Sequence, residues 1–183
     1  MIRYEKEDRD FRLSDHFTVG GLWLNNELDH IMVDGALVEL LEQFARRFGS
    51  TPRFLSKNAL YRTPKSNESA GGAEESQHVQ GRAADFTIDG VTPLELARYA
   101  EVLGAGGIGM YSSGAHIHAD VRAGEARWWL RTSGSNTSGF GGVPTVFKRG
   151  HRSLSNEMRT TVCRAIEHAN SGPFDGVGFR CSG

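Results

Sequence analysis

Two short segments of the sequence concentrate imidazole and carboxylate groups. The first, SQHVQGRAAD, contains His78 and Asp85, and the second, HIHAD, contains His116, His118 and Asp120. Three such ligands that leave a fourth position open for water are typical of a catalytic zinc site. An H-x-H pair alone is weak evidence, because alternation along any strand places both imidazoles on one face. Two segments that each carry imidazole and carboxylate groups, among small residues that allow close packing, together predict a metal site.

The favoured ligand set is His78, Asp85 and His118. Six residues separate the first two, so the chain must fold back through Gly81, where glycine permits the bend, for both to reach one ion. His118 is expected on a strand, with His116 on the same face. This set leaves a position for an activated water. The alternative is a closed, structural four-ligand site that also includes His116.

Length, charge and cysteine content restrict the class of protein. A chain of 183 residues can bury a core as one domain, and a net charge of -1 gives no field that would attract a nucleic acid. Cys163 and Cys181 are far from the histidine segments, so a thiolate zinc cluster is excluded. Whether these cysteines pair is left open, because a disulfide also requires an oxidising compartment.

No targeting signal is expected. Residues 1–10 are highly charged and lack the apolar stretch of a secretory signal, and no apolar run has the length of a membrane span. The protein is therefore expected to be made in the cytoplasm, without a membrane span and as a monomer. A substrate outside the cytoplasm would require phage-type release or a specialised export machine.

Apolar periodicity and turn residues predict the elements that position these segments. The expected elements are an irregular wrap over residues 11–33, a helix from Asp34 to Gly49, a strand over 53–56, a long polar loop over 57–77, a helix from Thr92 to Gly104, an antiparallel meander of three strands over 106–110, 115–121 and 126–131, and a helix over 154–169. These elements divide into a domain over 1–131 that contains the predicted metal site, a Gly/Ser-rich linker over 132–142, and a helical extension over 143–183 that packs on the same domain or stands apart.

The motifs YRTPKSN (61–67), S-x-H-x-x-G-x-A-x-D (76–85) and G-I-G-x-Y (107–111), which precedes H-x-D (118–120), resemble those of the M15 zinc peptidases. This group contains D-Ala-D-Ala carboxypeptidases and peptidoglycan endopeptidases. The resemblance covers roughly residues 11–131. It implies zinc bound by His78, Asp85 and His118, and a small α+β fold with an antiparallel sheet and flanking helices, like that of hedgehog and the DD-peptidases.

The same resemblance implies roles for three further residues. Arg62 matches the active-site arginine of the family, whose planar donor fork can hold a substrate carboxylate or stabilise a developing oxyanion. Tyr61 is expected to bind substrate beside Arg62. Ser76 is expected to hydrogen-bond the substrate, although a simple turn residue fits its position equally well.

The general base is the least determined part of the site. Some relatives carry a carboxylate three residues before the last zinc ligand, where this chain has Ala115. We favour His116 as the group that accepts the proton of water or stabilises the oxyanion. Asp120 is then a catalytic supporter that orients an imidazole, as carboxylates commonly do around metal ligands.

The expected function is a zinc metallopeptidase, a hydrolase that cleaves peptidoglycan stem peptides. It would act as a D-Ala-D-Ala carboxypeptidase or as an endopeptidase, for example of the endolysin type. The alternative is a zinc-stabilised cell-wall-binding module that has lost activity. Ala115 supports this alternative, because some relatives have a carboxylate at this position. A protein without metal would require both motifs to be accidental.

Overall fold

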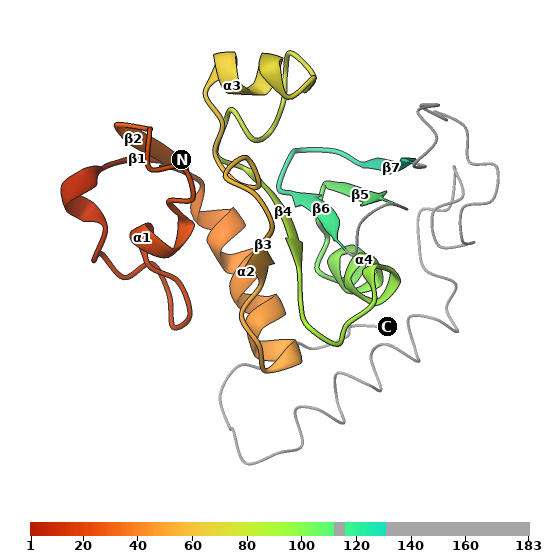
Figure 1. Cartoon of the computed structure of the whole chain (residues 1–183). Coiled ribbons are helices and arrows are strands. Elements are labelled where there is room, and N and C mark those ends of the chain that lie inside the picture. The colour runs from red at the N-terminus through yellow and green to blue at the C-terminus, as the bar shows by residue number, and fades with distance from the viewer. Residues whose placement is uncertain (112–115, 131–183) are drawn as a thin grey trace. The chain divides into compact units, whose positions relative to one another are not determined.

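The computed structural model describes residues 1–111 and 116–130 (Figure 1). Its helices are η1 (Lys6–Asp8, a 3-10 helix), α1 (Val19–Leu22), α2 (Gly35–Phe48), α3 (Pro64–Ser69) and α4 (Pro93–Val102). Its strands are β1 (Ile2–Glu5), β2 (His30–Val33), β3 (Arg53–Phe54), β4 (Ala83–Thr87), β5 (Gly107–Tyr111), β6 (Ile117–Asp120) and β7 (Ala126–Leu130). The predicted linker over 132–142, the extension over 143–183 and its two cysteines lie outside the described residues.

The strands form two sheets. β1 and β2 make an antiparallel ribbon, and the other strands make one sheet in the order β3-β4-β6-β5-β7. All neighbours in this larger sheet are antiparallel except β5 and β7, which are parallel. Helices and sheets together confirm the predicted α+β class.

The predicted meander is wrong in its connectivity. β7 does not return beside β6, which precedes it in sequence, but pairs with β5 at the edge of the sheet. Both sides of β6 are already occupied, because β4 binds one side and β5 the other. A strand that follows β6 can therefore extend the sheet only beyond β5 or β3.

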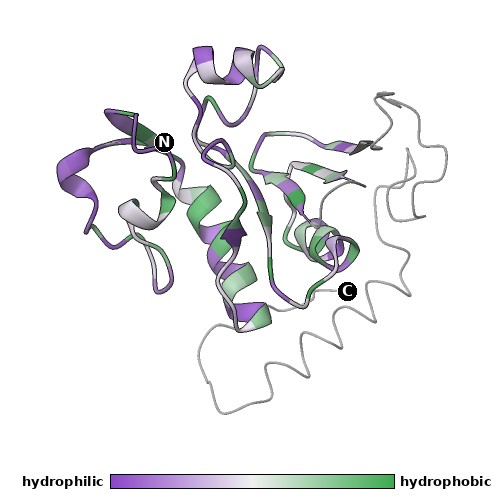
Figure 2. Cartoon of the chain, in the orientation of Figure 1, coloured by the Kyte–Doolittle hydropathy of each residue, from purple (hydrophilic) through white to green (hydrophobic). Residues whose placement is uncertain are grey.

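The hydrophobic core lies between the larger sheet and the helices α2 and α4. Phe44 of α2 makes an edge contact with Phe86 of β4, with ring centroids 4.8 Å apart, and another with Tyr99 of α4 at 5.1 Å. Figure 2 shows hydrophobic residues gathered in α2, α4 and the adjacent strands, whereas η1 and α3 are mainly hydrophilic. Within the described part of the chain, no helix combines the length and apolar character needed to span a bilayer.

Both long helices have the predicted ends. Asp34 caps α2 by accepting a hydrogen bond from the amide of Ala36, and Gly49 follows its last turn. Thr92 and Glu95 form the predicted capping box of α4. These local signals predict helix ends well because they depend only on neighbouring residues.

Two segments that were predicted to be irregular contain regular structure. The wrap over 11–33 includes α1 and β2, and the loop over 57–77 includes α3. A start signal for α3 was present, because the Thr63 hydroxyl accepts from the amide of Ser66 and Pro64 occupies the first turn. The helix is too short to give the apolar periodicity on which the prediction depended.

Gly81 makes the turn between the first histidine segment and β4. Its φ of +63° lies in the left-handed region, and a Cβ there would overlap the backbone carbonyl of Met32 in β2. The Gly81 carbonyl accepts from the amide of Asp34 at 2.9 Å, and Arg82 Nε donates to the Asp34 carboxylate at 2.9 Å. The predicted bend therefore also fixes the segment against β2 and the start of α2.

Gly81→Ala should lower the free energy of unfolding by roughly 2–4 kcal/mol, because left-handed strain adds to the overlap with Met32. Urea denaturation of the two proteins measures the difference. Gly35→Ala is the matched control, since a Cβ at Gly35 meets no atom within 4 Å. A Gly81→Ala protein as stable as the control would show that the turn can relax.

Glu42 is a buried carboxylate that holds the N-terminal segment on α2. Its oxygens accept from the Ser14 hydroxyl at 2.8 Å, the His16 amide at 3.1 Å and Arg46 Nε at 2.9 Å, and His16 Nδ1 lies 2.8 Å away. Burial alone would raise the pKa of Glu42, but the hydrogen bonds outweigh it and lower the pKa to about 2.

The contribution of Glu42 to stability should depend on pH. A lowered native pKa gives stability that is complete above the ordinary value of 4.5 and is lost as the pH falls toward about 2. Glu42→Gln should cost roughly 1–3 kcal/mol at pH 7, because partners of the carboxylate lose their acceptor. The difference from wild type should shrink between pH 4.5 and 2 in denaturation curves. Glu39→Gln, on the exposed side of α2, should change little; a constant Glu42→Gln deficit down to pH 2 would contradict this assignment.

Candidate metal centre

Three side chains from two strands and one turn converge on a single point. His78, Asp85 and His118 each offer one ligand atom, and these atoms lie within 4.8 Å of one another. His118 Nδ1 is 2.8 Å from Asp85 Oδ1 and 3.2 Å from His78 Nε2, which is 3.4 Å from Asp85 Oδ2. The structure therefore brings together the three residues that the sequence predicted as ligands.

Sheet register explains why Asp85 and His118 meet. They are directly opposite each other on β4 and β6, so their side chains leave the same face of the sheet as neighbours. His78 reaches this face from the turn that Gly81 closes. Residues of the opposite face, such as Phe86, point into the core instead.

The outer hydrogen bonds of the imidazoles determine which nitrogen faces the centre. His78 Nδ1 donates to the Leu60 carbonyl at 2.8 Å, which leaves Nε2 as the unprotonated atom. His118 Nε2 donates to Asp120 Oδ2 at 3.0 Å, which leaves Nδ1. Metal-binding imidazoles characteristically carry such a partner on the second nitrogen. Two imidazole nitrogens and one carboxylate, all aimed at one point, fit a divalent transition-metal ion such as zinc.

Charge also favours a cation here. Burial would raise the pKa of Asp85, but its contacts with the imidazoles of His118 and His78 outweigh burial and hold this pKa well below its usual range. Asp120 shows the same balance, with His118 and Arg122 lowering its pKa against burial. Both carboxylates are therefore ionised at neutral pH, and Asp85 is in the form that binds metal.

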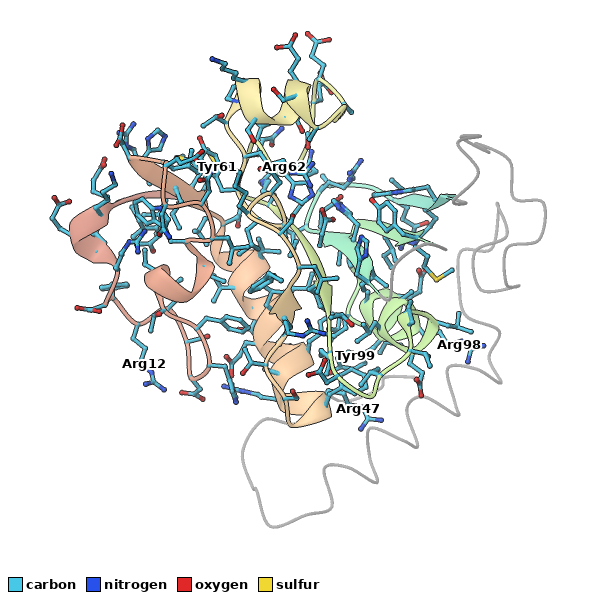
Figure 3. All side chains as sticks on the ribbon, in the orientation of Figure 1. Arg12, Arg47, Tyr61, Arg62, Arg98 and Tyr99 are labelled. Atoms are coloured by element: carbon cyan, nitrogen blue, oxygen red, sulfur yellow. The ribbon has the colours of Figure 1, made fainter. Side chains whose placement is uncertain are left out.

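Arg62 lies against the candidate ligands. Its Nη2 donates to Asp85 Oδ2 at 2.7 Å and its Nε donates to the Asn58 carbonyl at 2.5 Å. Tyr61 precedes it, and both residues lie on the segment between β3 and α3 (Figure 3). The Tyr61 hydroxyl is 3.5 Å from His30 Nε2 on β2.

The segment that carries Tyr61 and Arg62 is tied to the ligands by backbone hydrogen bonds. The amide of Asp85 donates to the carbonyl of Ala59 at 2.8 Å, and the amide of Arg62 donates to the carbonyl of His78 at 3.3 Å. With the bond from His78 to Leu60, these contacts connect residues 59–62 to two of the three ligands. We name residues 59–62 the anchor segment.

His116 lies beside the centre but does not belong to the converging group. It directly precedes β6, its ring stacks on Tyr111 with centroids 4.6 Å apart, and its Nδ1 has no hydrogen-bond partner among the described residues. A three-ligand group without His116 favours the open arrangement over the closed four-ligand one. Ala115, where some relatives have a carboxylate, is outside the described residues. Ser76 starts the turn that leads to His78, and its carbonyl accepts from the amide of Val79.

The sequence reasoning missed two partners of the site, Leu60 and Arg122. Leu60 acts through its backbone carbonyl, which no residue type reveals. Arg122 binds the Asp120 carboxylate through its amide at 3.0 Å and through Nε at 2.8 and 2.9 Å. A basic residue two positions after Asp120 was the available signal, although such a spacing is common at strand ends.

Comparison with known proteins gives a matching family and similar proteins. The model of the Peptidase M15 family matches residues 15–120. A probable peptidoglycan L,D-endopeptidase MepK of Haemophilus influenzae is 39% identical over 77 residues, which are 42% of this chain and 38% of that protein. The peptidoglycan L,D-endopeptidase MepK of Escherichia coli K12 is 38% identical over 61 residues, which are 33% of this chain and 32% of that protein.

The matched segments span only about a third of the length of these two relatives. The family match is broader, since it extends from the segment before β2 to the last residue of β6 and includes His78, Asp85 and His118. It confirms the family resemblance that the sequence motifs indicated. The chain belongs to the M15 family of peptidases.

Proposed function

We propose that the chain is a zinc-dependent peptidase that cleaves peptide bonds in the stem peptides of bacterial peptidoglycan. The observation that carries this proposal is the convergence of His78 Nε2, Asp85 and His118 Nδ1 on one point, each with a bonding partner behind it. Membership of the M15 family supports the peptidase activity. The two MepK relatives, by their names, favour an endopeptidase over a D-Ala-D-Ala carboxypeptidase.

In this proposal the three converging residues hold zinc. Zinc held by three protein ligands polarises a carbonyl and lowers the pKa of water toward neutrality. The hydrogen bonds from His78 to Leu60 and from His118 to Asp120 keep the two imidazoles in the tautomers that binding requires.

His116 is the proposed proton carrier. Its imidazole lies on the same sheet face as His118, and Nδ1 has no partner in the described part of the chain. A ring nitrogen can accept a proton from the attacking water and return it to the leaving amine. Asp120 cannot easily take this role, because its side chain is 0% exposed and bonds the edge of His118 that faces away from the centre. We therefore keep Asp120 as the residue that orients His118.

Arg62 is the proposed electrostatic group. Two of its nitrogens bind Asn58 and Asp85, which leaves Nη1 for the carbonyl or carboxylate oxygen of a substrate. A fixed guanidinium close to the ligands stabilises negative charge as it develops on that oxygen. Tyr61, within the anchor segment, and Ser76, at the start of the turn that leads to His78, are proposed substrate contacts.

Incubation of the purified protein with defined muropeptides, with and without a chelator, tests the proposal. Cleavage that is lost with the chelator and restored by zinc is the expected result, and product masses identify the bond. Products cut within the stem would support an endopeptidase, whereas loss of a terminal D-Ala would support a carboxypeptidase. Tight zinc binding without any cleavage would overturn the proposal in favour of a wall-binding module.

Arg62→Lys should fold and keep zinc but lose roughly 100-fold in kcat/KM. Lysine keeps the charge but has one nitrogen in place of the planar fork, so it cannot reproduce the geometry in which Nε and Nη2 of Arg62 bind Asn58 and Asp85 at once. Arg47→Lys, an exposed position near the end of α2 (Figure 3), is the matched control and should have wild-type activity. Full activity in Arg62→Lys would show that only the positive charge matters.

A further inference from the structure

Trp128 of β7 contacts the candidate ligand His118 across an intervening strand. Their ring centroids are 4.8 Å apart with planes at 50°, although β5 lies between β6 and β7 in the sheet. Gly109 is the β5 residue opposite both of them. A Cβ on Gly109 would overlap the indole at Cε2, Nε1 and Cζ2. The indole therefore reaches His118 only because position 109 has no side chain.

Gly107, the preceding glycine on the same face of β5, leaves room for the side chain of Asp120 in the same way. Gly107 pairs with Asp120, and a Cβ on Gly107 would overlap the carboxylate that binds His118 Nε2. Arg122 also binds this carboxylate, and its guanidinium lies 5.8 Å from the centroid of the Trp128 ring. Asp120, Arg122 and Trp128 thus form a continuous support around His118, over two glycines of β5.

Each part of this support restricts a different motion of the imidazole. The hydrogen bond to Asp120 fixes the edge of the ring that carries Nε2, but it allows the ring to swing about that bond. The indole of Trp128 lies against the ring and blocks the swing on its side. Fixing both leaves Nδ1 with one direction, toward His78 and Asp85.

We propose that Trp128 is a positioning residue for His118, and that Gly107 and Gly109 are required because they admit Asp120 and Trp128 against the imidazole. This inference rests on the proposed function, in which His118 binds zinc. It adds a steric requirement to the ligand set, namely that positions 107 and 109 carry no side chain. The G-x-G spacing of β5 thereby gains a role at the metal centre.

Zinc affinity of three variants tests the inference, with wild type and Gly35→Ala as references. The variants are Gly109→Ala, Trp128→Ala and the double variant that contains both changes. Affinity is measured by competition with a chromophoric chelator, and stability of the metal-free protein by urea denaturation. Both single variants should bind zinc roughly 10–100-fold more weakly, as expected for loss of an outer support. Trp128→Phe should recover part of this loss, because a planar ring still lies against His118.

The double variant distinguishes positioning from general packing. If Gly109→Ala acts by displacing the indole, it has nothing to displace once Trp128 is alanine, so the double variant should bind zinc as Trp128→Ala does. Additive losses, or wild-type zinc affinity in both single variants, would overturn the inference. So would losses of affinity that only follow losses of stability in the metal-free protein. Failure of the wild-type protein itself to bind zinc would instead overturn the proposed function.

Discussion

Changing His118 to alanine should abolish zinc binding and peptidase activity together, which is the largest effect expected of any single substitution. His118 Nδ1 is the atom closest to both other ligand atoms, at 2.8 Å from Asp85 and 3.2 Å from His78. Its loss leaves two ligands, so the drop in affinity should exceed the roughly 10–100-fold cost of losing an outer hydrogen bond. Elemental analysis of the purified variant measures the metal content, and muropeptide cleavage measures the activity.

His16→Ala is the matched control for this experiment. His16 contacts Glu42 on α2 and has no part in the converging group, so the variant should keep zinc even if its stability falls. Circular dichroism of both variants establishes that they are folded. One zinc per chain in a folded His118→Ala protein would refute the ligand assignment.

Changing His116 to alanine should have the second largest effect, and it should lower the catalytic rate without lowering the zinc content. If His116 carries the proton, the variant keeps zinc and loses roughly 100- to 10,000-fold in kcat. The stack on Tyr111 is also lost, so the stability of the variant should be recorded beside its rate. Metal content and turnover, measured on the same preparation, separate a chemical role from a ligand role.

Asp120→Asn is the comparison that identifies the proton carrier. Asparagine retains an acceptor for His118 Nε2 but weakens the bonds from Arg122, so a loss of roughly 10- to 100-fold in zinc affinity or activity is expected. Inactive Asp120→Asn with full zinc, beside nearly active His116→Ala, would make the carboxylate the base. Loss of zinc in His116→Ala would instead indicate the closed four-ligand site.

The three metal-binding candidates could be predicted from sequence because their residue types and their spacing alone are typical of metal ligands. Which nitrogen of each histidine faces the centre could not be predicted. For His78 that choice depends on the backbone carbonyl of Leu60, and for His118 it depends on Asp120 being held by Arg122. Such partners are determined by packing between segments that are distant in the sequence. They cannot be predicted from the spacing of residues along the chain.

The fold likewise has features that the sequence predicts and features that it does not. The ends of α2 and α4 were predicted because caps such as Asp34 and Thr92 act within one turn. The place of β7 beside β5 was not, because it depends on β6 being enclosed between β4 and β5. The glycines of β5 were predicted to lie in a strand, but the sequence did not reveal that the side chains of Asp120 and Trp128 lie against them.

In the proposed function, the anchor segment couples the affinity for the metal to the affinity for the substrate. Through Ala59, Leu60 and Arg62, the segment is bonded to His78 and Asp85, and it also carries the guanidinium proposed to meet the substrate. A ligand that stabilises one end of this segment should therefore also stabilise the other end. Linkage makes this cooperativity reciprocal: whatever factor zinc contributes to substrate affinity, substrate must contribute to zinc affinity. Peptidase that is losing zinc to a chelator would accordingly be protected by a substrate analogue that never touches the metal.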